Sequence, residues 1–327
     1  MHLRVSQYIS YFPRPFPILA HRSTTRTIAF TTRIMASPVE ERNTRTIHTA
    51  ACLIIGDEVL GGKTLDTNSA CMAKFCFRSG MALKRIEVIA DDPEEIAEAA
   101  KRMSDNYDFV VTSGGIGPTH DDITYQSLAK AFSLPLTLHQ ETVEKMKKLS
   151  KPHPSSTGFN WDVPSPALTA KLRMATLPID SSRPISSQVI FPCDDLWVPV
   201  CCVNGNIHVL PGIPQLFQKL LNGLRPIISP RLEDPDGKGV LRIIIKTPLA
   251  ESEVASYLAD LAARVEEKGV KVGSYPRWSK SNNSVTLVGK DEEFLESLVE
   301  EVEKNVKGCR AKDESEDESD KEVAKQG

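Results

Sequence analysis

The sequence lacks the features that would place it in several large classes of protein. It has no apolar run close to the roughly 20 residues needed to cross a membrane, so no membrane association is expected. Its seven cysteines form no CxxC pair and no Cys/His cluster, which argues against structural zinc and indicates buried, reduced thiols. The net charge is only −3, so nucleic-acid binding is not expected. What remains is a chain of 327 residues, 40% of them hydrophobic, which is enough for two domains with real cores.

Charge is concentrated at the two ends of the chain. Residues 1–39 carry five Arg and no acid, a composition typical of a mitochondrial transit peptide. We therefore expect residues 1–40 to be a presequence or disordered, with the mature protein in the mitochondrial matrix. A start at Met35 would instead leave the protein cytoplasmic. At the other end, seven acids face two Lys in residues 313–327, and we expect residues 309–327 to be a disordered acidic tail.

The stretch from Thr112 to Asp122 (TSGGIGPTHDD) carries the strongest functional signal. It follows an apolar run, Phe109–Val111, and leads into a segment with helical spacing, which predicts a strand, a glycine loop and a helix. Glycines let backbone N–H groups approach an anion closely, and the helix adds the positive end of its dipole. The backbone of Gly114–Thr119 is therefore predicted to hold a phosphate.

Two acids close this loop. Asp121 and Asp122 place carboxylates where the phosphate would bind, and bare carboxylates repel phosphate. Their pairing makes sense chiefly if a divalent cation lies between them, so the loop predicts metal-assisted chemistry on a phosphate-containing substrate. The plainer alternative is a tight turn in which an Asp caps the following helix.

A second strand end carries similar chemistry. Ala51–Ile55 is a short continuous apolar run, typical of a buried parallel strand, and it leads into Gly56, Asp57 and Glu58. Asp66, Thr67, Asn68 and Ser69 follow and begin a helix. Ligands of open α/β sheets bind outside the carboxyl ends of the strands, so both strand ends are expected to face one site.

These motifs resemble those of the MoaB/Mog (molybdopterin-binding-like) domain. The version is that of CinA-like proteins and of the amino-terminal half of eukaryotic FAD synthases. The similarity is collinear from about residue 47 to 308, and the Gly-Pro-Thr-x-Asp-Asp loop differs from the Gly-Gly-Thr-Gly loop of molybdopterin adenylyltransferases. The matching segments are Gly56–Gly61, Asp66–Ser69, Asp91-Asp92, Gly114–Asp122, Arg173–Pro178, Val209–Pro214, Ala250–Glu253 and Lys271–Pro276.

The expected fold is α/β. A three-layer MoaB/Mog-like domain with a parallel sheet is placed at residues 46–226, and a small α+β domain of βαββα order at residues 238–308. Asp92-Pro93 predicts a helix start, and Asn204-Gly205-Asn206 predicts a β-hairpin. After this hairpin we expect a helix that ends near Asn222-Gly223.

Residues 150–187 carry little periodicity beyond a short helix expected from Lys171 to Met174. Asp180-Ser-Ser-Arg-Pro stands where the family has an Asn- and Gly-rich pattern. In the small domain, a polar loop with Arg277, Trp278 and Lys280 is read as an exposed hairpin tip.

The resemblance implies a metal-dependent hydrolase of a nucleotide pyrophosphate bond, with FAD or an ADP-ribose-like dinucleotide as the favoured substrate. Thr119 and Asn68 would orient phosphate or ribose, and His120 is a weaker candidate for a proton shuttle. The predicted catalytic residues are Asp121, Asp122 and Thr119. The predicted ligands of Mg²⁺, Mn²⁺ or Co²⁺ are Asp121, Asp122, Asp57 and Glu58. The predicted substrate-binding residues are Gly114, Gly115, Gly117, Pro118, Asn68, Ser69, Gly56, Pro211 and Gly212.

Two other functions stay open at this point. One is molybdopterin adenylyl transfer, and the other is a non-catalytic module that binds a flavin or pterin nucleotide. FAD synthesis is not expected, because we see no room for the second, adenylating domain of eukaryotic FAD synthases, and the amidase domain of many CinA-like proteins is likewise not expected. A symmetric homo-oligomer is common in the family, and the oligomeric state of this chain stays open.

Overall fold

The computed structural model describes residues 38–150, 159–235, 239–276 and 283–311. The predicted presequence therefore lies outside the described residues except for its last three positions. The predicted acidic tail, residues 309–327, lies outside them from residue 312, but the prediction of disorder is wrong for its first two residues, which form a short strand. The loop with Arg277, Trp278 and Lys280 also lies outside the described residues. Among the described helices, none has the length and apolar composition of a bilayer span. All seven cysteines are free, and four of them are buried: Cys52, Cys76, Cys201 and Cys202.

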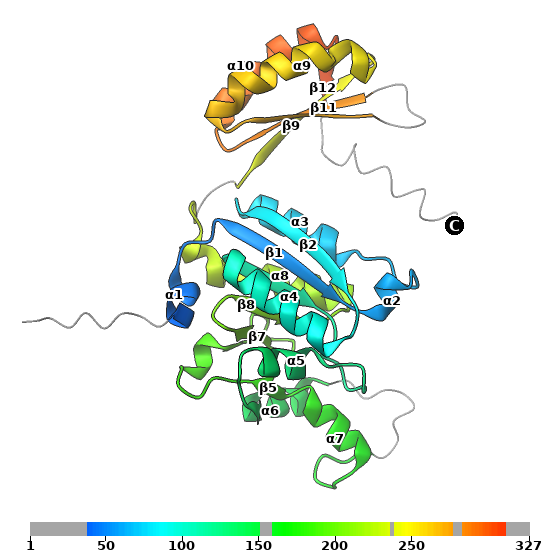
Figure 1. Ribbon diagram of the computed structural model, residues 1–327, viewed down its shortest axis with the longest axis vertical. Helices are drawn as coiled ribbons and strands as arrows, with labels where there is room; N and C mark the ends of the chain where they lie inside the picture. The colour runs from blue at the N-terminus through cyan, green and yellow to red at the C-terminus, as the bar shows by residue number, and fades with distance from the viewer. Residues whose placement is uncertain (1–37, 151–158, 236–238, 277–282, 312–327) are drawn as a thin grey trace, which may run out of the picture. The chain divides into compact units, whose positions relative to one another are not determined.

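A six-stranded sheet forms the centre of the larger domain (Figure 1). Its strand order is β2-β1-β3-β8-β7-β6, in which the first four strands are parallel and β7 is antiparallel to both of its neighbours, β8 and β6. The predicted hairpin at Asn204-Gly205 is confirmed, since it joins β7 to β8. The bounds are β1 Thr49–Ile55, β2 Ala82–Ile89, β3 Phe109–Ser113, β6 Val189–Ile190, β7 Val200–Val203 and β8 Ile207–Leu210.

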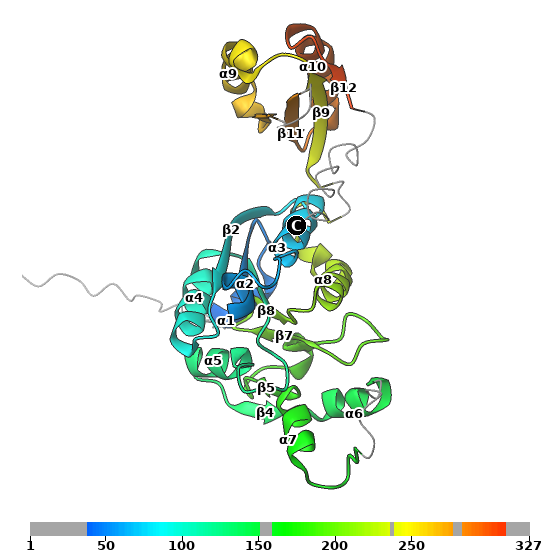
Figure 2. The same cartoon turned by 90° about the vertical axis from the view of Figure 1, so that its right-hand side faces the viewer.

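Helices cover both faces of this sheet, with α4 and α5 on one side and α3 and α8 on the other (Figure 2). The Asp92 side chain caps α4 by accepting from Glu94 N and Glu95 N, each at 2.9 Å, as the sequence predicts. Ile96, Ala99, Ala100 and Met103 lie on one face of α4 and are buried. The bounds are α1 Pro38–Thr44, α2 Asp57–Leu60, α3 Asn68–Arg78, α4 Pro93–Asn106, α5 Thr124–Ala131 and α8 Pro214–Ile228.

The sequence predicts that helix α8 ends near Asn222-Gly223, and this prediction is wrong. The helix continues to Ile228. The reason is that Leu224 and Ile228 extend its buried stripe by another turn and a half, which outweighs the roughly 1 kcal/mol cost of a helical glycine. Gly223 is also required there by close packing, because a Cβ at this position would lie 2.8 Å from the carbonyl oxygen of Pro192.

The segment between α5 and β6 forms a small excursion from the sheet. Strand β4 (Leu136–Leu138) pairs with β5 (Thr176–Pro178), and α6 (Gln140–Leu149) and α7 (Pro166–Arg173) lie between them in the chain. The expected short helix at Lys171–Met174 is thus the end of a helix that begins five residues earlier. Its start is fixed by Ser165, whose Oγ accepts from Leu168 N at 3.2 Å. A 3₁₀ turn, Ile185–Ser187, precedes β6.

The smaller domain has the predicted βαββα order. An antiparallel sheet of order β10-β11-β9-β12 carries α9 and α10 on one face. Its core is aliphatic, with Ile245, Leu261, Val285 and Val302 fully buried. The bounds are β9 Leu241–Thr247, α9 Glu251–Val265, β10 Lys271–Tyr275, β11 Asn283–Gly289, α10 Glu292–Asn305 and β12 Cys309–Arg310, with a 3₁₀ turn at Glu266–Lys268; a further 3₁₀ turn, Ser229–Arg231, follows α8 in the larger domain.

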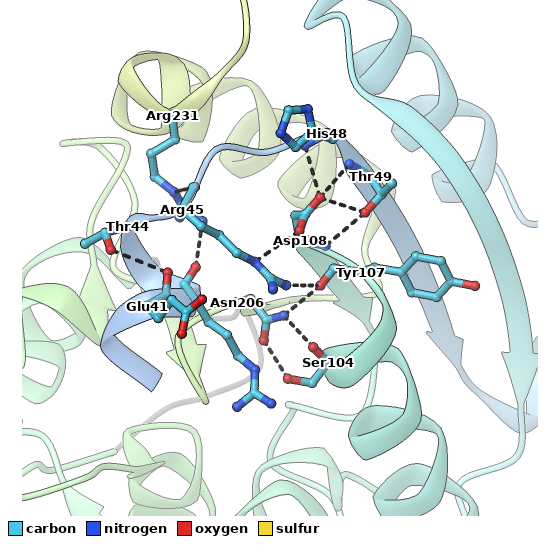
Figure 3. Close-up of polar contacts among 11 residues, drawn as sticks. Glu41, Thr44, Arg45, His48, Thr49, Ser104, Tyr107, Asp108, Asn206 and Arg231 are labelled. Atoms are coloured by element: carbon cyan, nitrogen blue, oxygen red, sulfur yellow. Dashed lines mark hydrogen bonds and ion pairs between the residues drawn. The ribbon is translucent and has the colours of Figure 1, made fainter. Parts of the chain in front are cut away.

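A polar network at the amino edge of β3 holds α1 against the larger domain (Figure 3). The Asp108 carboxylate accepts from Thr49 N at 2.9 Å and His48 N at 3.1 Å, and Arg45 Nε lies 3.0 Å from it. Arg231 Nε donates to the Arg45 carbonyl at 3.1 Å, which ties the segment after α8 to the same network. Although burial alone raises the pKa of Asp108, the hydrogen bonds from Thr49 and His48 and the charge of Arg45 bring it below its ordinary value.

Candidate active site at the carboxyl edge of the sheet

The carboxyl ends of the parallel strands lie level with one another. Ile54 on β1 pairs with Ser113 on β3, and Ser113 pairs with Leu210 on β8. On the other side of β1, Ile55 pairs with Ile89 of β2. The loops that begin at residues 56, 90, 114 and 211 therefore leave the sheet at the same edge. This is where ligands of parallel α/β sheets bind.

Asn68, the first residue of α3, links this helix to the end of β3 and to the loop after β8. Its Nδ2 donates to Ser113 Oγ at 2.9 Å and to the Gly212 carbonyl at 2.8 Å. The side chain is buried, with 6% of the residue exposed, and its Oδ1 has no protein partner among the described residues. A Cβ on Gly212 would lie 3.3 Å from Gly114 Cα, so the loops after β3 and β8 are in contact. The sequence-predicted residues Asn68, Gly114 and Gly212 are thus brought together.

The glycine loop after β3 has a conformation that other residues cannot readily adopt. Gly114 and Gly115 have φ of 108° and 64°. A Cβ on Gly114 would lie 2.1 Å from the Ile55 carbonyl oxygen, and one on Gly115 would lie 2.2 Å from Thr124 Oγ1. The Thr124 hydroxyl in turn donates to the Gly114 carbonyl at 2.9 Å. The glycines therefore allow the loop to pack directly on β1 and on the first turn of α5.

Asp122 folds back into this loop. Its Oδ1 accepts from Gly117 N at 2.6 Å, and its Oδ2 accepts from Thr119 N at 2.8 Å and Thr119 Oγ1 at 2.6 Å. It does not cap α5, whose N-cap residue is Ile123 without a side-chain bond. The plain alternative of an Asp N-cap is therefore wrong for the following helix. Two N–H groups predicted to hold a phosphate are bonded to a carboxylate of the chain itself.

Asp91 joins the acids of this edge, and it was not among the residues we predicted for the site. Its Oδ2 accepts from Asp57 N at 3.0 Å, and Asp57 Oδ1 accepts from Asp91 N at 3.3 Å. Burial, together with the charges of Asp57, Glu58 and Asp121, raises the pKa of Asp91. The Asp91-Asp92 pair is part of the family resemblance, which was the one sequence signal that could have placed Asp91 here.

The acids suit a divalent cation chemically, although they are not arranged around a single position. In the part of the chain that the structure describes, no three His, Cys, Asp or Glu side chains form a preformed metal site. Carboxylate oxygens are the ligands that Mg²⁺ prefers, and the mutual repulsion felt by Asp91 is what a cation would relieve. Asp121 is available, with 62% of its side chain exposed. Asp122 already accepts three hydrogen bonds, so only its Oδ1 keeps capacity for a further partner.

The other predicted residues lie at the same edge but differ in their hydrogen bonds and in their exposure. Gly56 N donates to the Ile89 carbonyl at 3.1 Å, and the Ser69 hydroxyl is bonded to Asp66. Pro118 is exposed in the glycine loop, whereas Pro211 is buried at the end of β8. His120 has 99% of its side chain exposed, and its Nδ1 lies 3.9 Å from Asp121 Oδ1.

Arg173 adds a positive charge near the acids of the glycine loop. The groups around Asp121 lower its pKa: the neighbouring Thr119 comes first, and the charges of His120 and Arg173 add to its effect. Arg173 comes from α7, and its Nη2 donates to the Asp122 carbonyl oxygen at 2.8 Å. It lies in a matching family segment but was not predicted as a site residue.

Comparison with known proteins agrees with this architecture. Residues 51–233 match the model of a probable molybdopterin-binding domain, and residues 240–314 match the middle domain of FAD synthase. A probable FAD synthase of Caenorhabditis elegans is 31% identical over 256 residues, which are 77% of this chain and 48% of that protein. The chain thus spans about half the length of the curated FAD synthases it matches.

Two other relatives come from archaea. A protein of Pyrococcus abyssi is 31% identical over 256 residues, covering 77% of this chain and 94% of its own length. The crystal structure of CinA from Thermoplasma acidophilum is 28% identical, covers 56% of this chain and 98% of its own, and superposes with a TM-score of 0.44. The chain therefore belongs to the molybdopterin-binding (MoaB/Mog-like) domain family, and this domain is followed by a segment that matches the FAD synthase middle domain.

Proposed function

We propose that this protein hydrolyses the pyrophosphate bond of FAD, or of a related dinucleotide such as ADP-ribose, in the presence of a divalent metal. The names of the relatives support a small flavin or pterin nucleotide as the ligand. The observation that carries the hydrolytic proposal is the meeting of a glycine loop with three acids, Asp57, Asp91 and Asp121, at one sheet edge. Anion-binding N–H groups beside carboxylates suit a metal–phosphate substrate.

The glycine loop would hold the pyrophosphate through its backbone. Gly117 and Thr119 already donate to Asp122, so a phosphate can use these two N–H groups only by displacing that carboxylate. Among the residues that the structure describes, none donates to the buried Oδ1 of Asn68, so this oxygen can accept from a hydroxyl of a ribose or ribityl chain. The family's flavin and pterin nucleotides offer such hydroxyl groups.

The cation would be held by Asp57, Asp91 and Asp121, with Glu58 and Asp122 Oδ1 as further donors. When bound, Mg²⁺, Mn²⁺ or Co²⁺ supplies charge neutralisation at the phosphates and lowers the pKa of an attacking water.

The reaction itself exchanges one bond for another. The water oxygen bonds to one phosphorus of FAD while the bond from that phosphorus to the bridging oxygen breaks, giving FMN and AMP. One proton of the water ends on the phosphate that leaves, and the other goes to solvent. His120, exposed beside Asp121, is placed to carry that proton outward.

The test is FAD turnover by the full-length protein with Mg²⁺, Mn²⁺, Co²⁺ or EDTA, followed by separation of FMN and AMP. Asp121→Asn is the variant, and Asp260→Asn, an exposed acid on α9, is the matched control. We expect metal-dependent release of FMN and AMP that is lost in the first variant and kept in the second. FMN with ATP is tested in parallel, because formation of FAD would assign an adenylyltransferase instead.

Two further outcomes would assign the alternatives. Tight binding of FAD or ADP-ribose without turnover in any metal would indicate a nucleotide-binding module. Adenylylation of molybdopterin from ATP would indicate the transferase activity suggested by the name of the family.

A further inference from the structure

Arg173 reaches the glycine loop from a distant part of the chain. It is the last residue of α7, and its Nη2 donates to the main-chain oxygen of Asp122, 51 residues away in sequence. Helix α7 has no buried residue of its own. The guanidinium thereby reaches the main chain of the residue whose carboxylate binds the N–H groups of the loop.

Its remaining donors have no protein partner of comparable strength. A guanidinium offers five N–H groups, and within the described ranges we find only the bond to Asp122. Arg173 Nε is buried without any hydrogen bond. Arg102 differs in this respect, because its guanidinium binds the carboxylates of Glu87 and Glu98. Arg231 is also bonded to carbonyl oxygens, but its Nε is one of the donors used, whereas the buried Nε of Arg173 is left for a ligand with acceptor oxygens.

The surrounding donors favour the same kind of ligand. Gly117 N, Thr119 N and Thr119 Oγ1 all point at the Asp122 carboxylate, while Arg173 binds the carbonyl of that residue. Four donors from two elements therefore converge around residue 122. A phosphate presents several acceptor oxygens and can be bound by the planar fork of an arginine through two of them.

We propose that Arg173 binds a phosphate of the substrate at the glycine loop and makes the site selective for phosphorylated nucleotides over nucleosides. This inference rests on the proposed function for its ligand class. The competing explanation is that Arg173 only positions the loop by holding the Asp122 carbonyl. The two differ in one measurable respect: contact with phosphate affects AMP but not adenosine, whereas loop positioning affects both.

The experiment is calorimetric titration of the full-length protein with AMP and adenosine, and with FMN and riboflavin. The variants are Arg173→Met, which removes the charge at similar length, and Arg173→Lys, which keeps it. Lys171→Met on the same helix is the control; its amine lies over the rings of Phe159 and Trp161, away from Asp122. Circular dichroism checks that each variant is folded.

We expect Arg173→Met to weaken AMP and FMN binding by roughly 10- to 100-fold and to leave adenosine and riboflavin unchanged. Arg173→Lys should lose less affinity for AMP, and Lys171→Met none. Equal losses for AMP and adenosine, in either Arg173 variant, would overturn the proposal, as would a wild-type protein without preference for AMP over adenosine. Because binding needs no turnover, an AMP-selective loss in a protein that does not hydrolyse FAD would refute the proposed reaction and leave the role of Arg173 standing.

Discussion

Gly115→Ala tests whether the glycine loop is held by its contact with α5. Gly115 has φ of 64°, and its Cβ would lie 2.2 Å from Thr124 Oγ1. The left-handed backbone costs an alanine about 1–2 kcal/mol. Moving the Thr124 hydroxyl away breaks its bond to the Gly114 carbonyl in a fully buried position, which costs about 1–3 kcal/mol more. The lower unfolded-state entropy of alanine returns about 0.4–1 kcal/mol.

The expected net loss in the free energy of unfolding is therefore about 1–5 kcal/mol. Gly62→Ala separates the two causes, because Gly62 has φ of 70° and nothing within 4 Å of its Cβ position. This control should cost only about 0–1 kcal/mol. Equilibrium urea unfolding followed by circular dichroism gives both values under the same conditions.

Thr124→Ala completes a double-mutant cycle. In that background the Cβ introduced by Gly115→Ala no longer meets a hydroxyl, so this substitution should cost about as much as Gly62→Ala, with a coupling energy of about 1–3 kcal/mol. Equal costs for Gly115→Ala and Gly62→Ala in the wild-type background would refute the steric argument. Additive effects in the cycle would refute the part assigned to Thr124.

Three further changes probe the larger domain. Asn68→Asp replaces the donor to the Gly212 carbonyl by an acceptor in a buried position, so it should reduce the free energy of unfolding by about 2–4 kcal/mol in urea titrations, with Asn305→Asp on α10 as an exposed control. Burial lowers the pKa of His208 to about 4, so the folded state takes up its proton later than the unfolded state; stability is complete above about pH 6.5 and falls from there toward pH 4. His208→Gln should flatten that decline in thermal melts, and an unchanged slope would contradict the assignment. The pKa of Asp108 is also lowered, so its contribution is present above about pH 4 and lost below it. Asp108→Asn should cost about 2 kcal/mol near neutral pH and little at pH 3, and an equal cost at both values would argue for packing rather than charge.

Local signals in the sequence predicted local structure well. Asp92-Pro93 and Asn204-Gly205 gave the helix start and the hairpin that the structure contains, because the capping bond and the turn backbone depend on neighbouring residues only. The parallel order of the first strands followed from their alternation with helices. The end of α8 was wrong because burial of Leu224 and Ile228 is a tertiary effect that the Asn222-Gly223 pair does not reveal.

The sequence predicted which loops lie at the candidate site but not the hydrogen bonds between their side chains. The loops at Gly56, Asn68, Gly114 and Gly212 were expected to meet, and the level register of their strands brings them together. The position of Asp122 beside Asp121 does not reveal that its carboxylate accepts hydrogen bonds from the glycine loop. Arg173 and Asp91 were missed as site residues because each comes from a separate element, and only the folded sheet brings them to the loop.

The position of α1 determines where a label can be attached without reaching the glycine loop. Val39 packs against the hairpin turn so closely that a Cβ on Gly205 would lie 2.3 Å from its carbonyl oxygen, and Arg42 pairs with Asp105 at 2.7 Å. Both contacts lie at the edge of the sheet opposite the glycine loop, about 17 Å away along a five-residue strand. A fluorophore attached on α1 itself would therefore lie at the edge of the sheet away from the glycine loop, which makes this helix a suitable place for a label.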